Sequence, residues 1–200
     1  MARPTKFDRE EALEFVMNEI WRNGYEACSV KAISEMLGIT RSSFYNAFTS
    51  REALFLEAFA LYVAQAPDKA LGDFEPGASV RELMTKVFRN LCRQRAADPE
   101  ARGCMAVNCI AEIVGVDPAL GGVLEKAVNA KRRKIEHLLI AAAKNGEIED
   151  DGDLAGKALA VMNLLVGLNL MSKVVRSEKQ LWASAKAGLE GLGLYAAGAR

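Results

Sequence analysis

The chain has 200 residues, of which 50% are hydrophobic and 26% are charged, an ordinary soluble composition that allows a sizeable buried core. Its 26 Lys and Arg residues balance its 26 Asp and Glu residues. A net charge of zero argues against indiscriminate nucleic-acid binding, so any such binding must depend on where the charges lie.

The apolar residues follow helical spacing nearly throughout, and no segment alternates as a β-strand does. We therefore expect an all-α protein of about nine helices. The first helix is expected over about 8–23, with Asp8 as its N-cap. The second is expected over about 29–37, and Gly38 supplies the turn that follows it.

A short third helix is expected over about 41–46, with Phe44 and Phe48 as its core anchors. Its other face is polar and offers hydrogen-bond donors for phosphates and base edges. A helix-turn-helix inserts such a helix into the major groove of double-stranded DNA. We expect the DNA-binding residues to be Ser29, Lys31, Thr40, Arg41, Ser42, Tyr45, Asn46 and Arg51.

Six further helices are expected in the rest of the chain. A sixth helix starts either at Asp98-Pro99, a cap followed by proline, or later, at about 102–104, if Gly103 delays it. The other five are expected over about 50–66, 79–97, 118–146, 154–176 and 178–197. This order predicts a three-helix helix-turn-helix domain over 1–54 and a helical effector-binding and dimerisation domain over 55–200.

The eighth expected helix, over 154–176, is apolar on most faces. Lys157, Asn163, Asn169 and Lys173 interrupt it, and each is costly in hydrocarbon, so we expect no membrane span. Such a helix is otherwise buried in a soluble core or an oligomer interface. With the stripe on the ninth helix it predicts a homodimer through helices eight and nine; that stripe is Leu181, Ala185, Leu189 and Leu192.

The four cysteines, Cys28, Cys92, Cys104 and Cys109, show no metal-ligand spacing, and His137 is the single histidine. We therefore expect no metal site and no cofactor. The charged start of the chain leaves no apolar core for a secretory signal. A cytoplasmic protein with reduced thiols is expected.

Three motifs near the N-terminus fall at the spacings of a known family. They are Gly24-Tyr25-Glu26-Ala27, Ser29-Val30-x-x-Ile33 and Gly38-Ile39-Thr40-Arg41-Ser42-Ser43-Phe44-Tyr45-x-x-Phe48-x-Ser50-Arg51-Glu52-Ala53-Leu54. Over about residues 8–60 the chain thus resembles the TetR family of transcriptional regulators. The family often has histidine at position 47, and alanine there leaves Tyr45 and Asn46 to make the phosphate contacts on that side.

Two motifs in the second half of the chain carry a weaker resemblance: Gly103-Cys104-Met105-x-Val107 followed by Ala111-Glu112, and Gly167-x-Asn169-Leu170-x-x-Lys173. They resemble the subgroup that includes the N-ethylmaleimide-responsive repressor. In some members a cysteine after this glycine senses electrophiles or oxidants, and a lysine at the place of Lys173 can assist it. The resemblance implies a sensing site of Cys104, Lys173, Asn108 and Met105.

Local features also bear on Cys104. A helix start and the cation of Arg102 both favour the reactive thiolate. The alternative is that Cys104 only packs as a small hydrophobe, as most free cysteines do.

These features predict a DNA-binding transcriptional regulator. We expect a homodimeric repressor that a small-molecule or electrophilic effector releases from a palindromic operator. One alternative is a noncovalent small-molecule sensor with no cysteine role. The alternative from a different class is a thiol-dependent redox enzyme, against which the chain shows no nucleophile–base pair and no CxxC motif.

Overall fold

In the computed structural model, residues 8–72, 77–150 and 152–199 are described, and they form helices and no strand, which confirms the all-α expectation. The elements of this part are α1 (Arg9–Asn23), α2 (Val30–Leu37), α3 (Arg41–Phe48), α4 (Arg51–Gln65), the 3-10 helix η1 (Lys69–Gly72), α5 (Val80–Ala97), α6 (Met105–Ile113), α7 (Pro118–Lys144), α8 (Leu154–Met171) and α9 (Glu178–Gly191).

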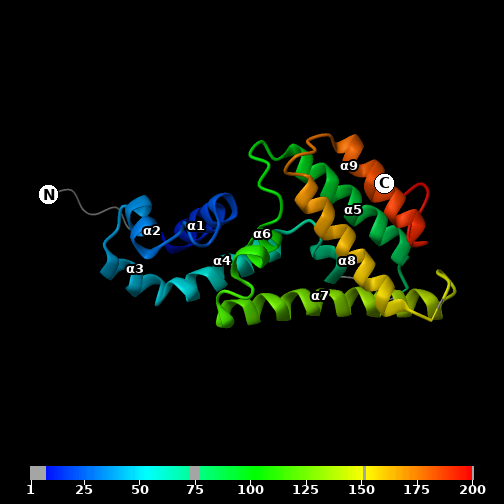
Figure 1. Cartoon of the computed structure of the whole chain (residues 1–200), viewed down its shortest axis with the longest axis horizontal. Coiled ribbons are helices and arrows are strands. Elements are labelled where there is room, and N and C mark those ends of the chain that lie inside the picture. The colour runs from blue at the N-terminus through cyan, green and yellow to red at the C-terminus, as the bar shows by residue number, and fades with distance from the viewer. Residues whose placement is uncertain (1–7, 73–76, 151, 200) are drawn as a thin grey trace.

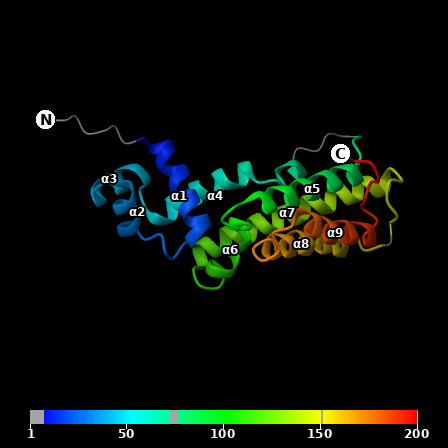
Figure 2. The same cartoon turned by 90° about the horizontal axis from the view of Figure 1, so that it is seen from above.

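The molecule is elongated, with the N-terminal helices at one end and a helical bundle at the other. Figures 1 and 2 show α1, α2 and α3 at one end and a bundle of α5, α7, α8 and α9 at the other. Between them lie α4, which continues from α3 toward the bundle, and the short α6, which lies against α1. Any signal from the bundle to α1–α3 therefore has α4 and α6 as its direct connections.

Side-chain caps define the starts of the short N-terminal helices. The hydroxyls of Ser29, Thr40 and Ser50 each accept an N–H from the third residue of the helix that follows, at 3.2, 3.1 and 3.0 Å. Such caps satisfy backbone donors that a helix start leaves open. Gly38 has φ +64, the left-handed conformation that glycine adopts without strain, and it ends α2.

Two helix ends differ from the sequence-based expectation, and of the two starts considered for the sixth helix the structure has the later one. The carboxylate of Asp98 accepts from the N–H groups of Glu100 and Arg102 at 3.3 and 2.9 Å, so Asp98-Pro99 closes α5 and α6 starts only at Met105. α8 ends at Met171 rather than near 176. α9 ends at Gly191 because Gly193, at φ +69, lets the next N–H groups turn back onto the last carbonyls.

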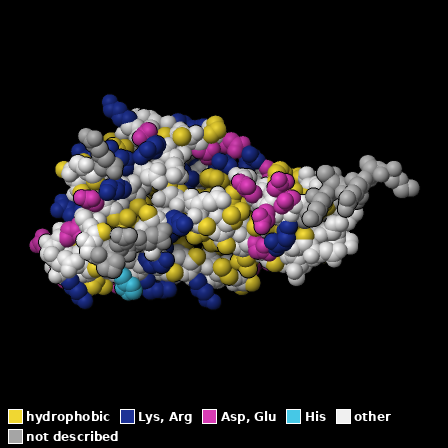
Figure 3. All heavy atoms as spheres, turned by 180° about the vertical axis from the view of Figure 1, so that it is seen from behind, with side chains coloured by type: hydrophobic (Ala, Val, Ile, Leu, Met, Phe, Trp, Pro, Cys, Tyr) yellow, Lys and Arg dark blue, Asp and Glu magenta, His cyan; other side chains and the backbone are white. Residues whose placement is uncertain are grey.

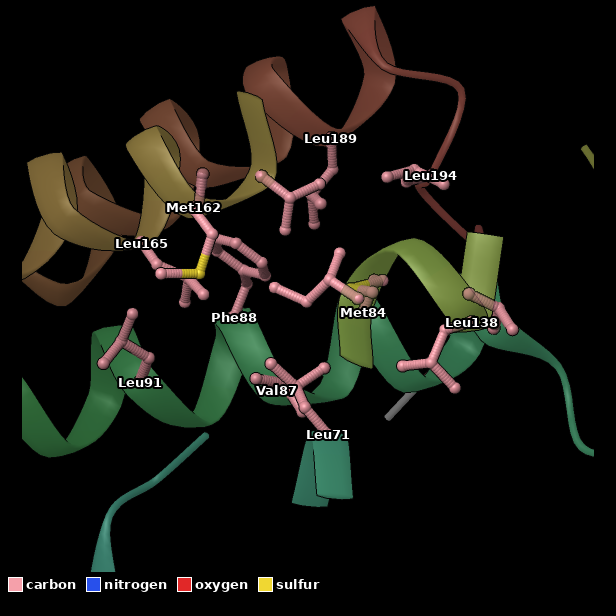
Figure 4. Packing of buried hydrophobic residues seen from close by; sticks show 14 of the residues in the cluster. Leu71, Met84, Val87, Phe88, Leu91, Leu138, Met162, Leu165, Leu189 and Leu194 are labelled. Carbon is pink, nitrogen blue, oxygen red and sulfur yellow. The ribbon is translucent and has the colours of Figure 1, made fainter. Parts of the chain in front are cut away.

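Two hydrophobic clusters organise the chain. One joins η1, α5, α7, α8 and α9, and Figure 4 shows Phe88 and Met84 of α5 facing Met162, Leu165 and Leu189. The other cluster joins α1–α4 with α6 and the first turns of α7. Leu54 and Phe55 are both fully buried in this second cluster, so continuous packing crosses the boundary expected between residues 54 and 55.

The apolar faces of α8 and α9 are divided between a core and a surface. α8 is long and apolar enough to cross a membrane by length and composition, but it packs between α7 and α9. Leu181, Ala185 and Leu189 of α9 are at most 3% exposed and pack inside the same protomer. The expectation that Leu189 lies on a surface open to a second copy is therefore wrong.

Candidate DNA-binding surface and effector site

The polar face of α3 is open to solvent. Phe44 and Phe48 are buried in the second cluster, as expected for core anchors. The opposite face exposes Arg41, Ser42, Tyr45 and Asn46. Amide, hydroxyl and guanidinium groups on one short helix are suited to the edges and phosphates of a DNA groove.

The residues that flank this surface differ in solvent exposure and in their side-chain partners. Ser29 and Thr40 are exposed although their hydroxyls also cap α2 and α3. Lys31 is exposed, with its ammonium 3.8 Å from Glu35. Arg51 is mostly covered: it donates to the carbonyls of Cys28 and Tyr25, so it supports the turn before α2, and its phosphate contact stays a prediction.

The charges of the N-terminal part are separated. α3 carries Arg41 and no acidic residue, whereas α1 exposes Glu10, Glu11 and Glu14. Figure 3 shows acidic side chains gathered on the N-terminal part on the face opposite to that of Figure 1. A zero net charge is thus compatible with a recognition helix, α3, that carries no acidic side chain to repel phosphate.

The expected sensing cysteine lies where α6 meets the end of α8. Cys104 is half-buried and occupies the N-cap position of α6. The preceding Gly103 has φ +68, and a Cβ atom there would lie 2.9 Å from the carbonyl oxygen of Asn169 and 3.1 Å from Cγ of Lys173. Only glycine allows this approach, which places the stem of Lys173 beside the start of α6.

Three of the four residues expected to form the sensing site, Cys104, Asn108 and Lys173, lie together at the start of α6. The ammonium of Lys173 donates to Oδ1 of Asn108 at 3.2 Å, and Nδ2 of Asn108 donates to the carbonyl of Arg102 at 3.0 Å. Met105 is fully buried in the second cluster. It therefore packs in the core and does not face solvent.

Burial distinguishes the thiols from one another. All four cysteines are free, and Cys104 alone among them is only half-buried. Burial raises the pKa of Cys28 to about 11 and those of Cys92 and Cys109 to about 12. Because the thiolate is the nucleophile, these three thiols are unreactive near neutral pH.

A buried cation lies beside Tyr62, whose hydroxyl neighbours Cys104, and it was not expected from the sequence. Arg95 of α5 is 4% exposed and donates to Oδ1 of Asn169 at 2.7 Å and to the hydroxyl of Tyr62 at 2.9 Å. Burial raises the pKa of Tyr62, the neighbouring Cys104 raises it further, and Arg95 opposes them. Its place at helical spacing after Phe88, Leu91 and Cys92 was the only sequence signal for Arg95, and it does not reveal these partners.

A small cavity lies next to this site, between α4, α6, α7 and α8. Its volume is about 120 Å³, the order of size that holds a molecule like benzene. Asn169 and the ion pair of Asp68 with Lys131 are its polar groups. The walls are otherwise apolar: Phe59, Val63, Ala106, Val107, Ile110, Ala127, Val128, Met162, Leu165 and Val166.

The start of α6 also contacts the DNA-binding part directly. Trp21 of α1 donates its Nε1–H to the carbonyl of Gly103 at 3.1 Å. The guanidinium of Arg102 stacks over the Trp21 ring, 3.8 Å from its centroid. Arg22 of α1 pairs with Glu100 at 2.8 Å. The candidate effector site and the helix-turn-helix therefore share one interface.

Comparison with known proteins agrees with this geometry. Residues 16–58 match the family described as bacterial regulatory proteins, tetR family, and residues 80–187 match the tetracyclin repressor-like C-terminal domain. An uncharacterised transcriptional regulator of Bacillus subtilis (strain 168), YezE, is 25% identical over 90% of this chain and 94% of its own. The transcriptional repressor ComR of Escherichia coli (strain K12) is 23% identical over 90% and 86%.

Solved structures show the same fold. A cysteine mutant of the regulator CifR, in complex with 26-base-pair operator DNA, is 27% identical with a TM-score of 0.81, covering 94% of this chain and 98% of its own. Reduced NemR of E. coli has a TM-score of 0.74 at 19% identity, over 91% and 95%, a likeness of fold alone.

Proposed function

Because the chain belongs to the TetR family and is a DNA-binding transcriptional regulator, we propose that it is a cytoplasmic repressor released from a palindromic operator when an electrophile modifies Cys104. The observation that carries this proposal is the half-buried thiol of Cys104 at the start of α6, the helix that contacts α1. CifR, whose operator complex carries substitutions at three cysteines, is consistent with it. Family membership excludes the thiol-dependent enzyme.

The mechanism depends on the spacing of two recognition helices. A dimer that reads a palindrome must present its two α3 helices about 34–36 Å apart, one turn of DNA. An adduct at Cys104 adds bulk where Gly103 already touches Asn169 and Lys173. α6 would have to shift, and its contacts with Trp21 would carry α1 and α3 away from that spacing.

The proposed dimer uses the outer faces of α8 and α9. α8 leaves four apolar side chains partly exposed on its own protomer: Leu159, Val166, Leu170 and Met171. The adjoining face of α9 is small or polar at Ala183, Ser184, Ala187 and Gly191, which lets another helix approach closely. An apolar patch of this kind marks an interface in a soluble protein.

Cys104→Ser tests the switch. We expect the variant to bind the operator as tightly as the wild type, and to stay bound after treatment with N-ethylmaleimide, whereas the treated wild type loses about 5–150-fold in affinity. The measurement is operator affinity before and after treatment, with mass-spectrometric mapping of the adduct. Release that persists in Cys104→Ser would contradict the covalent switch.

The cavity of about 120 Å³ favours a second candidate, release by a compact apolar ligand without covalent chemistry. Val107→Phe would fill space in that cavity from α6 without touching the thiol. If Cys104→Ser keeps its response to an inducer and Val107→Phe loses it, the noncovalent candidate replaces the covalent one.

Arg41→Ala tests base recognition by α3. Arg41 is exposed at the first position of α3, where an N-terminal residue of a recognition helix meets base edges. We expect loss of preference at one position in each half-site, about 1–3 kcal/mol per contact. Affinity for the selected operator and for random DNA is compared at one salt concentration. Equal losses on both would assign Arg41 to phosphate instead.

A further inference from the structure

Glu112, near the C-terminal end of α6, binds two consecutive backbone N–H groups of the turn between α1 and α2. Its Oε2 accepts from Tyr25 N at 2.8 Å, and its Oε1 accepts from Glu26 N at 2.7 Å. Hydrogen bonds to an ionised carboxylate are roughly twice as strong as neutral ones. Both oxygens of one side chain thus join the effector-binding part to the DNA-binding part.

The turn is shaped to receive this carboxylate. Gly24 has φ +84, and a Cβ atom there would lie 2.9 Å from Oε2 and 3.0 Å from Oε1 of Glu112. Successive N–H groups next to such a residue form a concave site for an anion. A side chain at position 24 would both strain the backbone and displace Glu112.

The same turn is tied to the helix-turn-helix on its other side. Arg51, the first residue of α4, donates to the carbonyl of Tyr25 at 2.5 Å and to that of Cys28 at 3.0 Å. Ser29, which directly follows Cys28, is the N-cap of α2. A displacement of the turn therefore moves the start of α2, against which α3 packs.

The other end of α6 forms the proposed effector site. Cys104 occupies the N-cap position at this end, and Ala106, Val107 and Ile110 line the cavity. At a rise of 1.5 Å per residue, Cys104 and Glu112 lie about 12 Å apart along one helix. We propose that Glu112 couples α6 to the recognition helix by transmitting a displacement of α6 to the turn before α2. This inference rests on the proposed function.

Glu112→Gln tests this coupling without any electrophile. The variant keeps the size of the side chain, removes its charge, and leaves one of the two N–H groups facing an NH₂ group. Amide hydrogen exchange in α6 is measured by mass spectrometry with and without saturating operator DNA selected from a random pool. Coupling between sites is reciprocal, so operator binding should slow exchange in the wild-type α6, by about fivefold or more.

In Glu112→Gln we expect that slowing in α6 to be lost, while exchange in α3 still slows because the DNA is bound. Glu125→Gln, at an exposed position of α7, is the matched control and should behave as the wild type. If Glu112→Gln does not fold, Glu112→Asp keeps the charge, shortens the reach by one methylene and should lose the same slowing.

Equal slowing of α6 exchange in the wild type and in the folded Glu112 variant overturns the proposal. So does an exchange rate in the wild-type α6 that operator DNA does not change. Neither result bears on whether an adduct at Cys104 releases DNA. Conversely, a Cys104→Ser variant that still responds to N-ethylmaleimide would rule out the covalent switch. The hydrogen-exchange test of Glu112 would still apply.

Discussion

Leu189→Glu is expected to unfold the C-terminal bundle rather than to release folded monomers. Leu189 is 0% exposed, and Figure 4 shows it pointing from α9 into the cluster around Met84 and Phe88. Removing a buried leucine costs about 2–5 kcal/mol. A carboxylate buried there without a partner costs several more.

That sum approaches the whole stability of a typical domain, about 5–15 kcal/mol. Thermal unfolding followed by circular dichroism measures the effect. Because a loss of this order lowers the unfolding temperature strongly, we expect no cooperative transition at 37 °C or above. Glu at the neighbouring exposed position 190 is already native, which shows that a charge is tolerated one residue away. A folded, monomeric Leu189→Glu protein would contradict the packing.

Leu170→Glu is expected to give a folded monomer with at least about 100-fold weaker operator binding. Leu170 is 55% exposed on α8, so a glutamate there stays hydrated in the single chain and costs little stability. In the proposed dimer it would meet the apolar face of the partner. Separate monomers lose the gain of about 10²–10⁴ that linking two binding modules provides.

Sedimentation velocity at micromolar concentration, together with operator affinity, measures this effect. Val116→Glu is the control, because Val116 is 75% exposed in the turn between α6 and α7, away from α8 and α9. It should remain a dimer with unchanged affinity. A Leu170→Glu protein that sediments as a dimer and binds the operator normally would place the interface elsewhere.

The helix-turn-helix could be predicted because the forces that define it are local. Thr40 is three residues from the N–H that it caps, and Gly38 ends α2 by its own backbone conformation. The spacing of Phe44 and Phe48 on one helical face decides which side of α3 is buried. Caps and periodicity act within one or two turns, so the sequence alone determined the polar surface of α3.

The C-terminal part required the tertiary structure, because its decisive contacts join distant segments. Periodicity marked Leu189 as apolar but could not say whether α5 or a second copy covers it. Asp98-Pro99 has the pattern of a helix start, yet the carboxylate of Asp98 bonds the loop that follows α5.

The effector site shows the same limit. The sequence marked Cys104, Asn108 and Lys173, and the fold brought them together. The sequence contained no sign that Arg95 lies buried against Tyr62, 33 residues away, or that Glu112 reaches Tyr25, 87 residues away. Short-range periodicity and capping determined the helices and the polar face of α3. Long-range packing alone decided which surface stays apolar and which residues link the two parts of the chain.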